Sequence, residues 1–122
     1  MTEKKMTLDL TYLKTMSDGS HEFELEMLNM IIEQIPEAIL RINELLAQKD
    51  WDMIRALAHK LKSSVGIFGL NELKDILIMI EKLVLDNGNM EEMPGMVNDL
   101  IQKSKVSMDA LNETIKTYSN GC

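Results

Sequence analysis

Apolar residues recur every three or four positions along almost the whole chain, which is the spacing of amphipathic helices. The pattern is clearest from Trp51 to Ile67, where the apolar positions form one stripe and Asp50 precedes them as a candidate N-cap. The same spacing predicts four further helices, separated by turn-forming residues: about Thr7 to Met16, His21 to Ala47, Glu72 to Leu85, and Met93 or Pro94 to Tyr118.

Each predicted helix has one face that we expect to be buried. The first helix would bury Leu10 and Leu13. Pro36 lies within the second helix, and because proline removes one backbone hydrogen bond, we expect a kink or a restart there. The buried face predicted for this helix is Phe23, Met27, Ile31, Ile35, Ala38, Ile42 and Leu45. For the last helix it is Met96 or Val97, Leu100, Ile101, Ser104, Met108, Leu111 and Ile115.

The predicted helices are joined by short connections. Gly69 would end the third helix, Asn71 could cap the next one, and residues 86–89 form a turn. Residues 119–122 would be a frayed tail. Four long helices with short connections predict an all-α fold, an antiparallel up-down-up-down four-helix bundle with the short N-terminal helix as a cap. The chain, 1–122, would be one domain with its core at about 7–118.

Composition narrows the class of protein. The formal charge is −7 and the thirteen basic residues are scattered, which argues against nucleic acid or an anionic membrane as a partner. No apolar run is long enough to be a secretory signal or to span a membrane. The one cysteine, Cys122, is the last residue, so a disulfide framework is excluded. We therefore expect a cytoplasmic protein.

His59 is the residue with the most promising chemistry. At about 100° per residue, it lies roughly 140° from the centre of the apolar stripe of its own helix and should face solvent. Lys62 follows one turn later and Ser63 lies beneath the ring, so a neutral imidazole nitrogen would be open to a partner and close to a positive charge. Such a group could accept a phosphoryl group from an aspartyl phosphate. The chain has no phosphate loop with which to make that group itself.

The run Ala58-His59-x-Leu61-Lys62-x-Ser64-x-x-x-x-Gly69 resembles the signature of histidine-containing phosphotransfer (HPt) domains of two-component phosphorelays. The resemblance extends to the segment 33–37, to the entry of the third helix at 49–51, and to the start of the fourth at 70–73. It implies a phosphorelay intermediate that accepts a phosphoryl group from the receiver domain of one response regulator and passes it to another.

The resemblance also assigns roles to single residues. His59 would be the phosphoacceptor, on the ring nitrogen farther from the backbone, and Lys62 would stabilise the charge of the phosphoryl group. Gly69 would be structural, ending the third helix. Glu81 matches a position where many members carry an acid or amide that bonds the other ring nitrogen, and a solvated surface glutamate is the alternative. Ser63 stands where the family usually has glycine, which would narrow the approach to the histidine or supply a hydroxyl to the phosphoryl oxygens.

The expected partners are receiver domains, a hybrid histidine kinase, or both. By the resemblance, their docking face surrounds the histidine and includes Leu13, Met16, Met27 and Gln34. The protein would act as a monomer without a cofactor of its own, because the receiver domain would supply Mg²⁺. Metal binding by this chain is not expected, since residues 86–89 resemble a calcium loop only in composition.

Two alternatives belong to other classes of protein. The chain could be a docking module for a regulator or kinase that is never phosphorylated. It could also be a histidine-kinase dimerisation domain, but that family has an acidic residue after the histidine and this chain has Lys60. The other histidine, His21, lies in a polar turn without a lysine at i+3 and is expected to be an ordinary surface residue.

Overall fold

The computed structural model describes residues 8–120, and within that range all regular structure is helical. This confirms the all-α prediction. The elements are α1 (Thr11–Ser17), α2 (His21–Gln48), α3 (Trp51–Ile67), α4 (Asn71–Leu85), a 3₁₀ turn η1 (Met90–Glu92) and α5 (Met93–Asn120).

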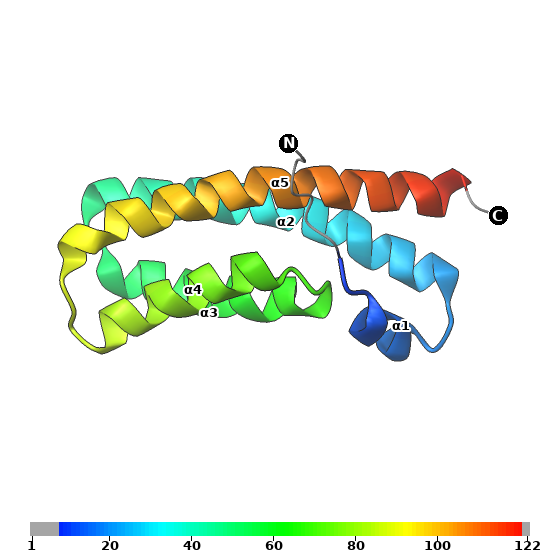
Figure 1. Cartoon of the computed structure of the whole chain (residues 1–122), viewed down its shortest axis with the longest axis horizontal. Coiled ribbons are helices and arrows are strands. Elements are labelled where there is room, and N and C mark those ends of the chain that lie inside the picture. Colours follow the sequence, from blue (N-terminus) through cyan, green and yellow to red (C-terminus); the bar gives the residue numbers. More distant parts are fainter. Residues whose placement is uncertain (1–7, 121–122) are drawn as a thin grey trace, which may run out of the picture.

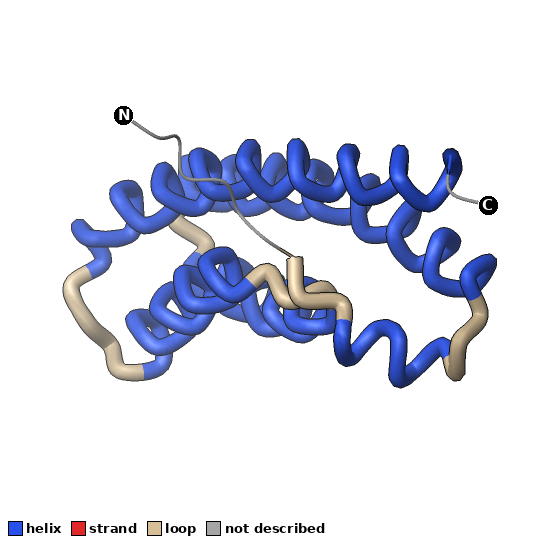
Figure 2. Tube along the Cα trace, turned by 45° about the vertical axis from the view of Figure 1, so that its right-hand side comes forward, coloured by secondary structure: helices blue, strands red, loops and turns tan. Residues whose placement is uncertain are grey.

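The four long helices form two pairs that pack on each other. Helix α2 lies beside α5, and α3 lies beside α4. Figure 1 shows the first pair along one edge of the molecule and the second pair along the other, and the turned view of Figure 2 shows the same arrangement. The pairs are joined because α3 also packs on α2, and α4 on α5. Helix α1 lies beyond the ends of α3 and α4 and packs against α2 (Figure 1).

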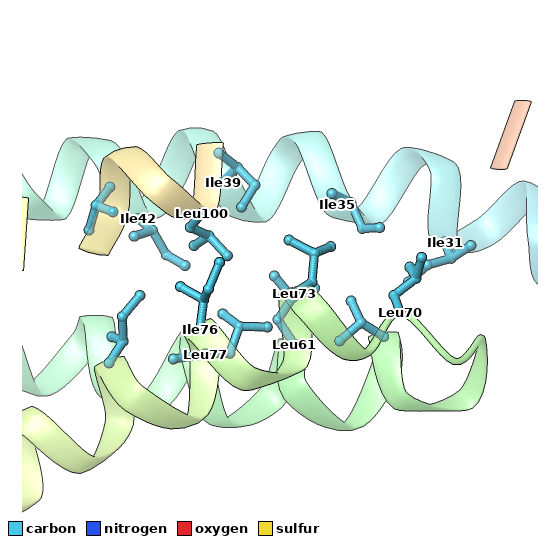
Figure 3. Close-up of a cluster of buried hydrophobic side chains, with 14 of the residues drawn as sticks. Ile31, Ile35, Ile39, Ile42, Leu61, Leu70, Leu73, Ile76, Leu77 and Leu100 are labelled. Carbon is cyan, nitrogen blue, oxygen red and sulfur yellow. The ribbon is translucent and has the colours of Figure 1, made fainter. Parts of the chain in front are cut away.

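The hydrophobic core fills the space between the two pairs (Figure 3). Its members include Ile35 and Ile42 from α2, Leu77 from α4 and Leu100 from α5, each fully buried. Burial of such aliphatic side chains stabilises the fold by about 1.5–3 kcal/mol each. The core therefore holds all four long helices in fixed positions, and the outer faces of α3 and α4 are left for other contacts.

The first helix begins later than predicted. The pattern placed its start at Thr7, which lies outside the described residues, but Leu8 to Leu10 are not helical and α1 starts at Thr11. The Asp9 carboxylate accepts a hydrogen bond from the Thr11 backbone N–H at 3.1 Å. At the other end of the chain α5 extends to Asn120, so Ser119 and Asn120 are helical rather than frayed.

Helix α2 continues through Pro36 without a restart, so a kink is the one of the two predicted outcomes that remains compatible with it. Figure 1 shows its N-terminal end bending away from the line of α5. Its first two turns are also rotated from the predicted face, because the residues buried there are Glu24 and Leu28, while Phe23 and Met27 are only half-buried. Periodicity could not place Glu24 inside, since its partners come from α1 and α5. Further along α2, Ile39 is buried and Ala38 half-buried.

The N-cap of α3 is the predicted residue, whereas the N-cap of α4 is not. Asp50 caps α3, its side chain accepting from the Met53 N–H at 3.3 Å. Asn71 is the first residue of α4 rather than its cap, and Leu70 holds the cap position without a side-chain hydrogen bond. Gly69 has a φ of +69°, in the left-handed region that favours glycine. A Cβ built on Gly69 would lie 2.5 Å from the backbone nitrogen and oxygen of Asp9.

Candidate functional site

His59 faces solvent from the middle of α3, as predicted. The opposite face of the helix carries Ile54, Ala58, Leu61 and Val65, all buried in the core. The His59 side chain is 61% exposed. A rigid, well-packed helix therefore presents an imidazole ring at the outer surface of the α3–α4 pair.

Glu81 of α4 contacts both functional candidates of α3. Its Oε2 atom lies 2.7 Å from Nδ1 of His59, and its Oε1 atom accepts a hydrogen bond from Nζ of Lys62 at 2.8 Å. The three residues thus form one network in which a carboxylate joins the ring and the ammonium group. Glu81 is buried, so the alternative of a solvated surface glutamate is wrong.

The carboxyl group of Glu81 is an ionised acceptor. The hydrogen bond from Lys62 is the main cause that lowers its pKa below the ordinary 4.5, and the bond to His59 acts in the same direction. Burial opposes this shift in the pKa without reversing it. An ionised carboxylate only accepts hydrogen bonds, so Nδ1 of His59 is the donor.

This hydrogen bond decides which ring nitrogen is available for chemistry. With the proton held on Nδ1, a neutral imidazole has its free electron pair on Nε2. Nε2 is the nitrogen farther from the backbone. The arrangement can therefore present a nucleophile of fixed tautomer and orientation to an approaching electrophile.

An open hollow of about 670 Å³ adjoins this network, and three helices line it. Lys62, Ser63 and Gly66 contribute from α3, Lys74 and Ile78 from α4, and Tyr12 from α1. Ser63 is exposed at this hollow, beside the histidine, as the helical spacing predicts. Lys74 was not among the predicted site residues. It precedes Glu81 by seven residues, which is two helical turns, so both side chains lie on the same face of α4.

The four residues predicted for partner docking are placed differently from one another. Leu13 is fully buried in the core, so it is not part of a surface in this structure. Met16 is exposed at 42%, and Met27 is half-buried. Gln34 is half-buried and donates a hydrogen bond from Nε2 to Oγ of Ser64 at 3.3 Å, which joins α2 to α3. The burial of Leu13 confirms the prediction from helical spacing and contradicts the docking role that the resemblance implied.

A second polar cluster joins α1, α2 and α5, and sequence reasoning missed it. The buried carboxylate of Glu24 accepts hydrogen bonds from the hydroxyls of Ser17 and Tyr118. The bond from Ser17 is the main cause that lowers the pKa of Glu24, followed by the bond from Tyr118. His21 is exposed, as expected, but its ring stacks on that of Tyr118 with centroids 4.6 Å apart.

Two further properties concern the described residues as a whole. None of the helices within residues 8–120 is both long and apolar enough to cross a membrane. The same residues contain no group of three or more histidine, cysteine or acidic side chains that could hold a metal ion.

Comparison with known proteins bears directly on this site. The family model of the Hpt domain matches residues 26–118, which include His59, Lys62 and Glu81. A search of curated proteins finds no match to the chain. Hpt domains carry out histidine phosphotransfer in phosphorelays and interact with receiver domains and kinases of two-component systems. Since the match covers most of the sequence, and since an exposed histidine lies on a helical scaffold within it, this chain belongs to the Hpt domain family.

Proposed function

We propose that this protein is a phosphorelay intermediate that accepts a phosphoryl group on Nε2 of His59 from the aspartyl phosphate of one receiver domain and passes it to another. The observation that carries this proposal is the 2.7 Å contact of Nδ1 with the buried carboxylate of Glu81. It leaves Nε2 as the free nucleophile on a ring that is 61% exposed.

The transfer would be an in-line displacement at phosphorus. The electron pair of Nε2 forms the P–N bond while the P–O bond to the receiver aspartate breaks, and the aspartate leaves as a carboxylate. The ring keeps its proton on Nδ1 and becomes positively charged, and the ionised Glu81 beside it stabilises that charge. The reverse displacement, by the aspartate of a second receiver, returns His59 to its neutral form.

Lys62 would have two roles. One of its N–H groups holds Glu81, which keeps that carboxylate ionised and in place. An ammonium group has three N–H donors, so two remain for the oxygens of the phosphoryl group. Lys62 is thus proposed to stabilise the transferring charge and also to position the partner of the nucleophile.

The remaining requirements fall to the partner. The receiver domain would supply Mg²⁺ and an acidic pocket, since this chain is proposed to work without a cofactor of its own.

An antiparallel up-down-up-down order of α2 to α5 is supported by the packing of each long helix on its sequence neighbour and of α2 on α5. The monomeric state and the cytoplasmic location stay predictions from the sequence.

The test uses a small donor and a protein donor. Wild type, His59→Gln and His21→Gln are incubated with phosphoramidate, and separately with radiolabelled phospho-receiver domains and Mg²⁺. Wild type and His21→Gln should gain an acid-labile, alkali-stable label, and NMR should place the phosphorus on Nε2. His59→Gln should gain none.

Equal labelling of His59→Gln would remove the proposed acceptor. A wild type that binds receiver domains and gains no label from either donor would instead identify a docking module that is never phosphorylated.

A further inference from the structure

The hollow beside the histidine differs in charge from the rest of the molecule. The chain has a formal charge of −7, yet the hollow is lined by two lysines, and no acidic residue takes part in its lining. Lys62 is paired with Glu81, whereas no acid within residues 8–120 forms an ion pair with Lys74. The ammonium group of Lys74 is therefore a local positive charge that no ion pair among the described residues neutralises.

The side chain of this lysine lies over Gly66 of α3. A Cβ built at position 66 would lie 3.8 Å from Nζ and Cδ of Lys74, which is ordinary van der Waals contact. The Lys74 side chain thus extends from α4 across the surface of α3 at this point. Gly66 follows His59 by seven residues, so the lysine lies about 10 Å along the helix from the phosphoacceptor.

The other lining groups suit an acidic side chain on an aliphatic stem. Ser63 and Tyr12 each carry a hydroxyl donor, and Tyr12 is 59% exposed. Ile67 and Ile78 provide apolar walls, and Ile78 is 39% exposed. A carboxylate could thus be met by Lys74 and a hydroxyl while its methylene groups contact the isoleucines.

We propose that this hollow receives an acidic side chain of the partner receiver domain, and that Lys74 is the specificity-determining cation for it. The inference rests on the proposed function, because docking at the hollow places the partner within reach of His59. Complementary charge of this kind mainly raises the rate of association and selects among partners. The net negative charge of the chain would otherwise work against an acidic partner.

The test measures transfer from phosphorylated receiver domains of the source organism to wild type, Lys74→Glu, Lys74→Arg and Lys105→Glu. Lys105 is a matched control, because it lies on α5 at the opposite pair of helices and the charge change is identical. For each variant, the second-order rate constant of transfer from the receiver domain is divided by the second-order rate constant of labelling by phosphoramidate. This ratio should fall about tenfold for Lys74→Glu, as for loss of a favourable rim charge, and stay within about twofold for the other two variants.

A reciprocal change then identifies the partner acid. Reversal of one surface Asp or Glu of the receiver to Lys should restore transfer to Lys74→Glu and impair transfer to wild type. Equal ratios for Lys74→Glu and Lys105→Glu would overturn the proposal. So would a wild type that accepts from phosphoramidate but from none of the receiver domains, whereas failure of phosphoramidate labelling would refute the role of His59 itself.

Discussion

Nδ1 of His59 donates a hydrogen bond to Oε2 of Glu81, a residue 22 positions later in the chain and on the next helix. The bond fixes the tautomer of an exposed ring through a buried carboxylate. It therefore links the packing of α3 on α4 to the proposed reactivity of the histidine.

Replacing Glu81 should release the tautomer of His59. In Glu81→Ala the population with the proton on Nε2 should rise, and labelling by phosphoramidate should slow about tenfold or more, because a hydrogen bond to a charged group contributes about 1.5–3 kcal/mol. Nitrogen chemical shifts of the imidazole measure the tautomer. Glu72→Ala on the same helix is the control, since its carboxylate faces Lys103. Unchanged shifts in Glu81→Ala would contradict this account.

Acid should weaken the fold through the same carboxylate. The pKa of Glu81 is lowered from 4.5 mainly by Lys62, so its contribution to stability is present above about pH 4.5 and is lost as pH falls through the folded pKa. Lys62→Met should therefore lose free energy of unfolding at neutral pH, and the gap to wild type should close below pH 4.5. Urea unfolding at several pH values measures it. Lys103→Met, which loses only an exposed pair with Glu72, should show no such closing gap.

Alkali should weaken the fold at the polar cluster that joins α1, α2 and α5. Burial and the hydrogen bond to Glu24 raise the pKa of Tyr118 to about 12. Because this folded pKa lies above the ordinary 10.0, the stabilisation is present below pH 10 and is lost as pH rises toward 12. Tyrosinate absorbance should show a late transition that Tyr118→Phe removes and Glu24→Gln moves to lower pH. A late transition that persists in Tyr118→Phe would assign it to another group.

Gly69 should tolerate no side chain, and Gly19 provides the control. Both have positive φ, so alanine at either position should cost about 1–2 kcal/mol of backbone strain. A Cβ at position 19 would meet nothing within 4 Å, whereas one at position 69 would meet the backbone of Asp9. Gly69→Ala should therefore destabilise by about 3 kcal/mol or more, and urea unfolding should separate the two variants. Equal losses would show that Asp9 moves away freely.

Residues whose neighbours lie within the same helix could be predicted from the sequence. The stripe of Ile54, Ala58, Leu61 and Val65 places His59 outside by helical geometry alone, and the cap at Asp50 follows from its side chain. The all-helical class follows from the same periodicity. The resemblance of the motif around His59 then pointed to the family that the comparison confirmed.

Other features depended on contacts between helices. Periodicity assigns Glu24 to the surface, because only the approach of Ser17 and Tyr118 supplies the hydrogen bonds that make a buried carboxylate stable. The resemblance placed Leu13 at a docking face, whereas the spacing of the first helix placed it on the buried side. The packing of α1 against α2 decides between the two expectations, and Leu13 lies in the core.

The sequence by itself determined the helices, the outward position of His59 and the family. Only the tertiary structure decided which nitrogen of that ring is free, because the proton is held by Glu81 of another helix and the charge of Glu81 is maintained by Lys62. It also gathered Tyr12, Ser63 and Lys74 from three helices around one hollow. Local spacing fixes the direction of a side chain, but the electrostatic partners that tune it come from residues that meet only when the helices pack.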